Sequence, residues 1–161
     1  MNDQGAYRHV TILMIEDDEG HARLIERNIR RAGVNNEIVH VADGQSAMRA
    51  LREGVAESRG GVAASREGVA PLRKPTLVLL DLNLPDMSGI TILEYMKNDP
   101  ALKMVPVIVL TTTDDEREIE RCYELGANVY ITKPVDYQQF AMAISRLGLF
   151  LSVIQVPGSG R

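Results

Sequence analysis

The chain has 161 residues, a net charge of −4 at pH 7, 45% apolar and 25% charged residues, and one cysteine. This length and balance suit one globular domain whose core needs no disulfide bonds. A slightly acidic chain without a cluster of Lys or Arg is not expected to bind nucleic acid. Its polar N-terminus lacks the apolar core of a signal peptide, and its apolar runs are far shorter than a membrane span. We therefore expect a soluble, cytoplasmic protein that does not bind membranes.

Short apolar runs alternate with amphipathic segments along the chain. The predicted strands are residues 10–15, 37–41, 76–80, 105–110 and 129–131. The predicted helices that follow them, in the same order, are residues 21–31, 44–52, 90–97, 116–125 and 137–151. The helical segments repeat their apolar residues at 3.6-residue spacing. The first, third and fourth strands are almost continuously apolar, which is typical of strands covered on both faces.

Residues that end or begin helices support this assignment. Gly33 and Gly126 follow predicted helices, at the position where a left-handed residue is often needed. The stretch Asp86-Met87-Ser88 offers an N-cap for the third helix. Strand and helix thus alternate five times, and right-handed crossovers with this pattern favour an open, doubly wound parallel sheet. Ligands of such sheets bind at the carboxyl ends of the strands.

One segment, residues 54–75, interrupts the alternation and is predicted to be a long loop insertion. Around it the motif Arg-x-Gly-Val-Ala recurs at a period of seven residues, as REGVA at 52–56, RGGVA at 59–63 and REGVA at 66–70. The segment is either a partner-binding loop or a slipped duplication, which a surface loop tolerates because long loops cost little stability. Glycine in every unit disfavours a coiled coil despite the period.

Acidic residues follow two of the predicted strands. Glu16, Asp17 and Asp18 come directly after the first strand, and Asp81 comes directly after the third. If these strands are neighbours in the sheet, the carboxylates lie close together and repel one another, and a divalent cation such as Mg²⁺ relieves the repulsion. The alternative is that the first three acids only cap the next helix. That alternative accounts for Asp18 but not for Asp81 at a separate strand end.

The fourth and fifth strands end in residues that suit a phosphoryl group. Thr111, Thr112 and Thr113 follow the fourth strand, and their hydroxyls can bond a phosphoryl oxygen. Lys133 follows the fifth strand, and its ammonium can neutralise phosphate charge. Each feature alone is weak, since Thr favours strands and a single Lys is usually a solvated surface charge. All four strand ends together predict a phosphoryl-accepting site at one edge of the sheet.

Four motifs give the chain a resemblance to a known family. They are ILMIEDD at 12–18, LLDLNLPDMSG at 79–89, VIVLTTT at 107–113 and YITKP at 130–134. In order and spacing they resemble the receiver domain of response regulators of the single-domain, chemotaxis-regulator type. The resemblance covers residues 9–150, apart from the insertion at 54–75. It implies a flavodoxin-like fold with a five-stranded parallel sheet in the order 2-1-3-4-5 and five helices.

The resemblance also implies a role for each matching residue. Asp81 is the phosphoacceptor. Glu16, Asp17 and Asp81 hold Mg²⁺, with Asp17 as a direct ligand and Glu16 acting through water. Asn83 supplies its backbone carbonyl to the metal. The remaining roles fall to Thr111 as the switch hydroxyl, Lys133 as the cation that pairs with the phosphoryl group, and Tyr130 as the aromatic switch residue.

A narrower resemblance concerns the partners. The sequences after Asp81 and after the fourth strand, the long loop and the ending at residues 138–150 resemble response regulators of bacterial phytochromes. This implies a two-component protein that takes its phosphoryl group from a sensor histidine kinase, in this case a bacteriophytochrome. It then signals by protein contacts or onward phosphotransfer. Such a domain is not an enzyme beyond its own phosphotransfer and autodephosphorylation.

The predicted C-terminal arm, residues 151–161, begins with an unusually apolar stretch. Exposed apolar surface indicates an interface. We expect a homodimer through the arm, or through the face made by the fourth helix, fifth strand and fifth helix; the alternative is that the arm folds back on its own domain.

Two other classes of protein stay open. An aspartyl-phosphate hydrolase usually carries a second Asp where this chain has Asn83, and a phosphate-independent scaffold would not need Asp81, Thr111 and Lys133.

Overall fold

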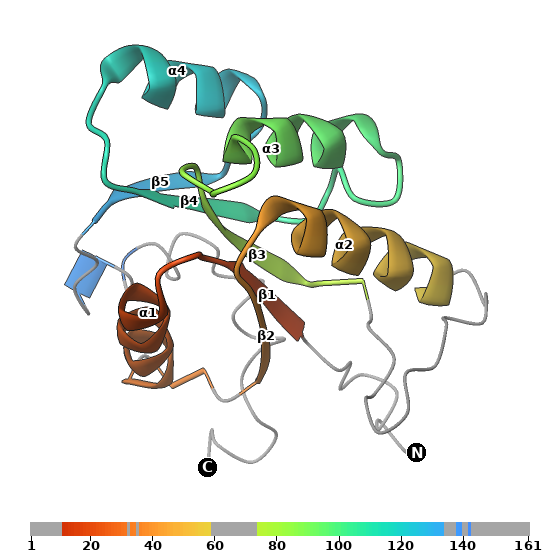
Figure 1. Ribbon diagram of the computed structural model, residues 1–161, viewed down its shortest axis with the longest axis horizontal. Coiled ribbons are helices and arrows are strands. Elements are labelled where there is room, and N and C mark those ends of the chain that lie inside the picture. The colour runs from red at the N-terminus through yellow and green to blue at the C-terminus, as the bar shows by residue number, and fades with distance from the viewer. Residues whose placement is uncertain are drawn as a thin grey trace.

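The computed structural model describes residues 11–31, 33–34, 36–58, 74–133, 138–139 and 142. Within this part the strands are β1 (Thr11–Ile15), β2 (Glu37–Val41), β3 (Leu77–Asp81), β4 (Val107–Thr111) and β5 (Val129–Thr132). The helices are α1 (Glu19–Arg31), α2 (Gly44–Ser58), α3 (Gly89–Asn98) and α4 (Glu116–Glu124). All strand pairs are parallel and the sheet order is β2-β1-β3-β4-β5. The predicted doubly wound sheet and its strand order are confirmed (Figure 1).

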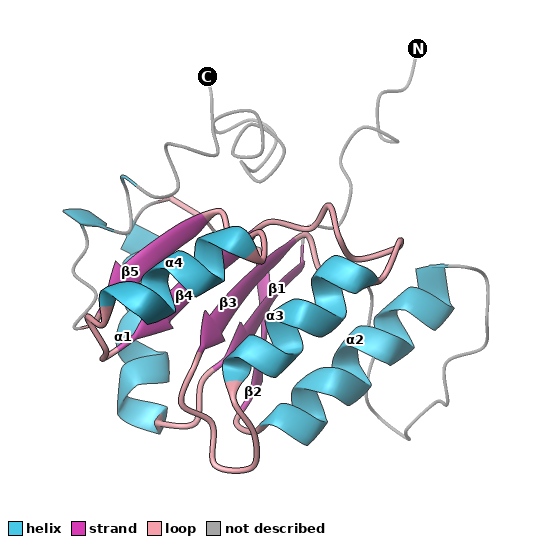
Figure 2. Ribbon diagram, turned by 90° about the horizontal axis from the view of Figure 1, so that it is seen from above, coloured by secondary structure: helices cyan, strands magenta, loops and turns pink. Residues whose placement is uncertain are grey.

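Two hydrophobic layers enclose the sheet. Helix α1 covers one face and helices α2, α3 and α4 cover the other (Figure 2). Alternate residues of each central strand enter different layers: Ile12 and Met14 of β1 pack with α1, whereas Leu13 and Ile15 pack with α2 and α3. β1, β3 and β4 are buried throughout, so their side chains are mostly apolar on both faces, and the buried polar exceptions are Thr11, Asp81 and Thr111 at the strand ends. This is the origin of the unbroken Val, Ile and Leu runs in the sequence.

Helix ends follow the predicted signals. Gly33 and Gly126 have φ values of 88° and 108°, the left-handed region in which glycine avoids the steric cost of a side chain. Ser88 is the N-cap of α3, and its hydroxyl accepts a hydrogen bond from the Ile90 amide at 3.1 Å. Asp18 caps α1 in the same way, since its carboxylate accepts the His21 amide at 2.9 Å.

The predicted start of the long loop is wrong. Helix α2 does not end at residue 52 but continues to Ser58, so residues 54–58 of the predicted 54–75 insertion are helical. The physical reason is burial: Val55 lies four residues after Leu51 on the same side of the helix, and both pack into the core beneath α2. That packing outweighs the helix-breaking tendency of Gly54. Residues 59–73 of the insertion lie outside the described residues.

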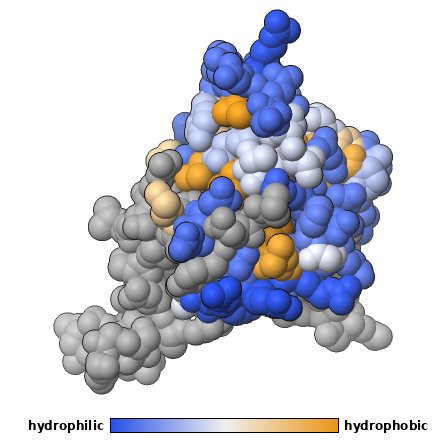
Figure 3. Space-filling view, turned by 90° about the vertical axis from the view of Figure 1, so that its left-hand side faces the viewer, coloured by the Kyte–Doolittle hydropathy of each residue, from blue (hydrophilic) through white to orange (hydrophobic). Residues whose placement is uncertain are grey.

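The C-terminal predictions are only partly covered by the structure. Four helices are defined in the described residues, and most of the predicted fifth helix at 137–151 lies outside them, although residues 138, 139 and 142 are helical. The arm at 151–161 lies entirely outside them. In the described ranges, no helix is long and apolar enough to cross a membrane. Among the described residues, the face seen in Figure 3 is largely hydrophilic, with separate hydrophobic spots.

Candidate phosphoacceptor site

Strand register brings the predicted site residues to one edge of the sheet. β1 and β3 are neighbours, and Ile15 is paired with Leu80, so the residues that follow them, Glu16 and Asp81, emerge at the same level. On the other side of β3, Asp81 is paired with Leu110, the residue before Thr111. Parallel strands end at a common edge, and the strand order places these ends side by side. The predicted neighbourhood of the first and third strand ends is therefore present.

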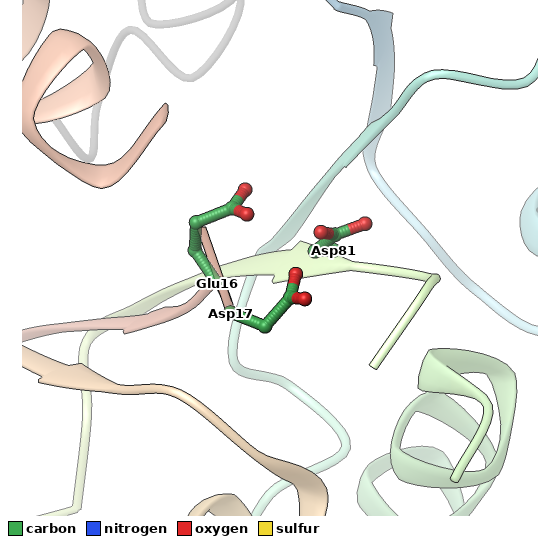
Figure 4. A group of neighbouring side chains, drawn as sticks. All are labelled: Glu16, Asp17 and Asp81. Atoms are coloured by element: carbon green, nitrogen blue, oxygen red, sulfur yellow. The ribbon is translucent and has the colours of Figure 1, made fainter. Parts of the chain in front are cut away.

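Three carboxylates gather at this edge. Glu16, Asp17 and Asp81 each offer an oxygen, and these oxygens all lie within 4.8 Å of one another. In Figure 4, Glu16 and Asp17 diverge from adjacent positions after β1, and Asp81 lies across from them on β3. Glu16 and Asp81 are buried, whereas Asp17 is exposed. The cluster thus concentrates negative charge at a point that solvent reaches from the side of Asp17.

The buried carboxylate of Glu16 is held at both of its oxygens. One accepts a hydrogen bond from Lys133 Nζ at 2.5 Å, and the other accepts the Asp18 amide at 3.0 Å. Burial raises the pKa of Glu16 above its ordinary value, and the Asp81 charge adds to the rise, while the bonds from Lys133 and Asp18 oppose it. The ring of His40 on β2 contacts the Glu16 backbone carbonyl at 2.7 Å, which fixes this corner of the chain.

Lys133 supplies the positive charge of the site. Its side chain is only 6% exposed, and Nζ lies 3.1 Å from Asp81 Oδ2 as well as 2.5 Å from Glu16. Nζ also lies 3.3 Å from Nδ1 of His21, the third residue of α1. A buried ammonium between two buried carboxylates offsets part of their repulsion. The structure therefore places the predicted lysine in the acidic cluster, and not on the solvated surface where a single Lys is usually found.

Thr111 and Tyr130 lie on the neighbouring strands and are linked through Thr113. Thr111 is fully buried, and its hydroxyl oxygen accepts the Thr113 amide at 3.4 Å. The half-buried Tyr130 donates its hydroxyl to the Thr113 carbonyl at 3.0 Å. Burial raises the pKa of Tyr130, and the nearby Glu118 carboxylate raises it further, so the phenol is a hydrogen-bond donor at neutral pH. A displacement of Thr111 can therefore be transmitted to Tyr130 through one residue.

A cavity of about 490 Å³ opens beside the acidic cluster. Its lining comes from the end of β1, the loop between β3 and α3, and α4: Asp17, Leu82, Asn83, Leu84, Pro85, Met87, Ser88 and Glu118. The Asn83 amide donates to Asp81 Oδ1 at 3.0 Å, which ties this lining to the acidic residue of β3. The cavity gives a small ligand a route to Asp17 and to the segment of Asn83.

The donor set suits a hard divalent cation. Carboxylate and carbonyl oxygens are the ligands that Mg²⁺ and Mn²⁺ prefer, with waters completing the coordination. Glu16 has both oxygens engaged by the protein, whereas the Asp17 carboxylate has no hydrogen-bonding or ionic partner in the described part of the chain. Asp17 is therefore the carboxylate most available for direct coordination.

The comparison with known families decides the classification. The family model of the response regulator receiver domain matches residues 12–145. The chain belongs to the response regulator receiver family. Receiver domains bind a divalent metal and act as signalling domains, which are generally not classed as enzymes.

Three relatives show how similar this receiver domain is to known ones. It is 32% identical over 150 residues to "Response regulator Rcp1" of Synechocystis, covering 92% of this chain and 93% of the relative. A receiver domain structure from Rhodospirillum rubrum is 59% identical with a TM-score of 0.64, covering 92% of this chain and 97% of that one. The phosphorylated cyanobacterial phytochrome response regulator RcpA is 34% identical with a TM-score of 0.69, covering 94% and 100%. The resemblance to phytochrome response regulators is thereby confirmed.

Some residues of this edge carried no signal in the sequence. His21 reaches Lys133 only because α1 begins beside the end of β5. Glu118 of α4 lines the same cavity as residues of the loop after β3. Neither belongs to a short motif, and only the tertiary arrangement brings them near the acidic cluster.

Proposed function

We propose that this receiver domain accepts a phosphoryl group on Asp81 from a histidine kinase, with Mg²⁺ bound by Asp17, Asp81 and the Asn83 carbonyl and by Glu16 through water. The observation that carries the proposal is the buried group formed by Glu16, Asp81 and Lys133, with the carboxylate of Asp17 beside it, which has no partner among the described residues. Mg²⁺ and the Mn²⁺ bound in a crystal structure of Rcp1, which is 31% identical to this chain, are both hard cations that prefer oxygen ligands.

In the proposed reaction, the Asp81 carboxylate attacks the phosphorus of phosphohistidine in line with the leaving nitrogen. An O–P bond forms, the N–P bond breaks, and the histidine leaves with its electron pair. The bound cation would lower the charge repulsion between Asp81 and the phosphoryl oxygens. Lys133 already contacts Asp81 at 3.1 Å and is placed to pair with a phosphoryl oxygen. Water later hydrolyses the acyl phosphate, and Asn83 and Thr113 flank its expected path.

The proposed output is a change in the face formed by α4 and β5. A new phosphoryl dianion at Asp81 attracts the Thr111 hydroxyl, and Thr113 links that hydroxyl to Tyr130. Loss of the bond between Tyr130 and the Thr113 carbonyl frees the ring to rotate inward, which changes the surface of α4 and β5. A homodimer through this face or through the C-terminal arm remains a prediction, and light scattering with and without acetyl phosphate tests it.

Incubation with acetyl phosphate, followed by intact-protein mass spectrometry, tests the proposed function. We expect the mass of one HPO₃ group to be added when Mg²⁺ is present and not when EDTA removes it. Asp81→Asn should abolish the addition. Asp18→Asn is the matched control, because Asp18 lies outside the carboxylate cluster and Asn caps a helix as well as Asp does. Labelling of Asp81→Asn, or sustained turnover of p-nitrophenyl phosphate by the wild type, would contradict the proposal.

We further propose a bacteriophytochrome as the kinase. RcpA is described as a phytochrome response regulator and RtBRR, 34% identical to this chain, as a bacteriophytochrome response regulator. Phosphotransfer from an autophosphorylated bacteriophytochrome should be much faster than from a histidine kinase of another class at equal concentration. Equal rates from both kinases would argue against this partner.

A cytoplasmic location also remains a prediction.

A further inference from the structure

The N-terminus of α2 is held by a residue from a distant part of the chain. The first backbone N–H groups of a helix have no partner within the helix. In α2, the amides of Gly44 and Gln45 donate to the two carboxylate oxygens of Asp86 at 2.7 and 2.9 Å. Asp43, the residue before the helix, accepts the Ser46 amide at 2.7 Å. Two of these three amides are thus bonded by a side chain 41 or 42 residues away in sequence.

Asp86 lies in the loop that carries the candidate metal-binding backbone. This loop connects β3 to α3 and is closed at its base, where Asn83 and Ser88 form an antiparallel bridge and the Gly89 amide donates to the Leu82 carbonyl at 2.9 Å. At the same base, the Asn83 amide donates to the Asp81 carboxylate. The outer part of the loop has a different anchor, which is the pair of bonds from Asp86 to α2.

Packing supports the same connection. The side chain of the residue after Asp86, Met87, lies so close to α2 that a Cβ added at Gly44 would be 2.3 Å from Met87 Cγ. Backbone hydrogen bonds lower the pKa of Asp86, with the bond from Gly44 as the largest cause, so the carboxylate is ionised at neutral pH. Hydrogen bonds to an ionised acceptor are stronger than neutral ones. The loop between β3 and α3 is therefore tied at its base to the phosphoacceptor strand and at its outer end to α2.

We propose that Asp86 is a positioning residue for the phosphoacceptor site: by tying the loop between β3 and α3 to the N-terminus of α2, it holds the backbone of Asn83 beside Asp81 in the arrangement that binds the cation. This inference rests on the proposed function, since it assigns the loop the task of presenting a backbone ligand. Asp86 itself contacts neither the cation nor the phosphoryl group. Its action passes through the loop.

The test compares Asp86→Ala with Asp43→Ala. Both variants remove a carboxylate that caps α2, but only the first releases the loop. Isothermal titration of the unphosphorylated proteins with Mg²⁺ should show about a tenfold weaker affinity for Asp86→Ala, as is usual when a group that orients a metal ligand is lost. Asp43→Ala should change the affinity less than about twofold. The Asn83 amide should exchange its hydrogen faster in Asp86→Ala and at the wild-type rate in Asp43→Ala.

A second variant keeps the test decisive if Asp86→Ala folds poorly. Asp86→Asn retains one acceptor oxygen, so it can bond only one of the two α2 amides well, and its Mg²⁺ affinity should lie between those of the wild type and Asp86→Ala. Equal Mg²⁺ affinities for the Asp86 and Asp43 variants would overturn the inference and leave Asp86 as a helix cap. Failure of the wild type to bind Mg²⁺ would instead overturn the proposed function, and this inference with it.

Discussion

Replacing Asp81 with Asn should stabilise the protein when no divalent cation is present. Two carboxylate oxygens within 4.8 Å of each other repel by at least about 3.5 kcal/mol at an effective dielectric constant of about 20, and Asp81 faces two such neighbours, Glu16 and Asp17. Lys133 at 3.1 Å attracts Asp81 by about 5 kcal/mol on the same scale. The Asp81 carboxylate therefore experiences a small net repulsion from its charged neighbours. This repulsion adds to the cost of burying the ionised Asp81 side chain, which is only 5% exposed. We expect a gain of about 2 kcal/mol in the free energy of unfolding.

Urea denaturation monitored by circular dichroism, with EDTA and then with Mg²⁺, measures this effect. The wild type should gain about 1.4 kcal/mol at a Mg²⁺ concentration ten times its Kd, and Asp81→Asn should gain much less because it has lost a ligand. Glu120→Gln removes an exposed carboxylate from α4 and should change stability by less than about 0.5 kcal/mol. If Asp81→Asn without cation is no more stable than the wild type, the three carboxylates are not in net repulsion and the reasoning fails.

Three further changes test other parts of the site. Lys133→Met leaves Glu16 and Asp81 without the ammonium that pairs with them, so it should lower the free energy of unfolding by about 3 kcal/mol in EDTA, and Mg²⁺ should restore part of the loss. Equal stability of this variant and the wild type in urea denaturation would contradict the prediction. Gly89→Ala places a Cβ 2.4 Å from the Asp81 carbonyl oxygen, which belongs to rigid backbone, so it should lower the free energy of unfolding by about 1–3 kcal/mol and slow labelling by acetyl phosphate. Wild-type stability together with a wild-type labelling rate would contradict this prediction. Glu118 has one buried oxygen with no partner among the described residues, and burial raises its pKa above 4.5. The folded state therefore binds its proton more tightly than the unfolded state, and stability is lost as the pH rises through the raised value. Because Glu118 is only partly buried, solvent screens the effect, and Glu118→Gln should be more stable than the wild type by up to about 0.5 kcal/mol at about pH 7 and by nothing at about pH 4. Equal gains at both pH values would contradict this reasoning.

The fold and the centre of the site were predictable because both depend on local pattern. Buried parallel strands are mostly apolar on both faces, so β1, β3 and β4 are visible as nearly continuous apolar runs, and the acids at the carboxyl ends of two of them are visible as interruptions. Once the strands are parallel and the first and third are neighbours, as the resemblance implies, Glu16 and Asp81 meet at one edge of the sheet. The same reasoning placed Lys133 in the cluster.

The residues that sequence reasoning missed depend on contacts between distant segments. The end of α2 was misplaced because Gly54 is a poor helix former, and only the burial of Val55 against the sheet reveals why the helix continues. The bonds from Asp86 to Gly44 and Gln45 join residues 41 and 42 positions apart, and they exist only because α2 and α3 pack on the same face. The sequence places Asp86 in the stretch predicted to cap α3, whereas its carboxylate caps α2.

The position of the phosphoryl group is the most direct test of the account. Borohydride reduces an acyl phosphate on aspartate to homoserine, and peptide mass spectrometry then locates the modified residue. After treatment with acetyl phosphate and Mg²⁺, homoserine should be found at position 81 and at no other acidic residue. Homoserine at position 17, or its absence from a protein that carries the phosphoryl mass, would show that the buried carboxylate of β3 is not the acceptor.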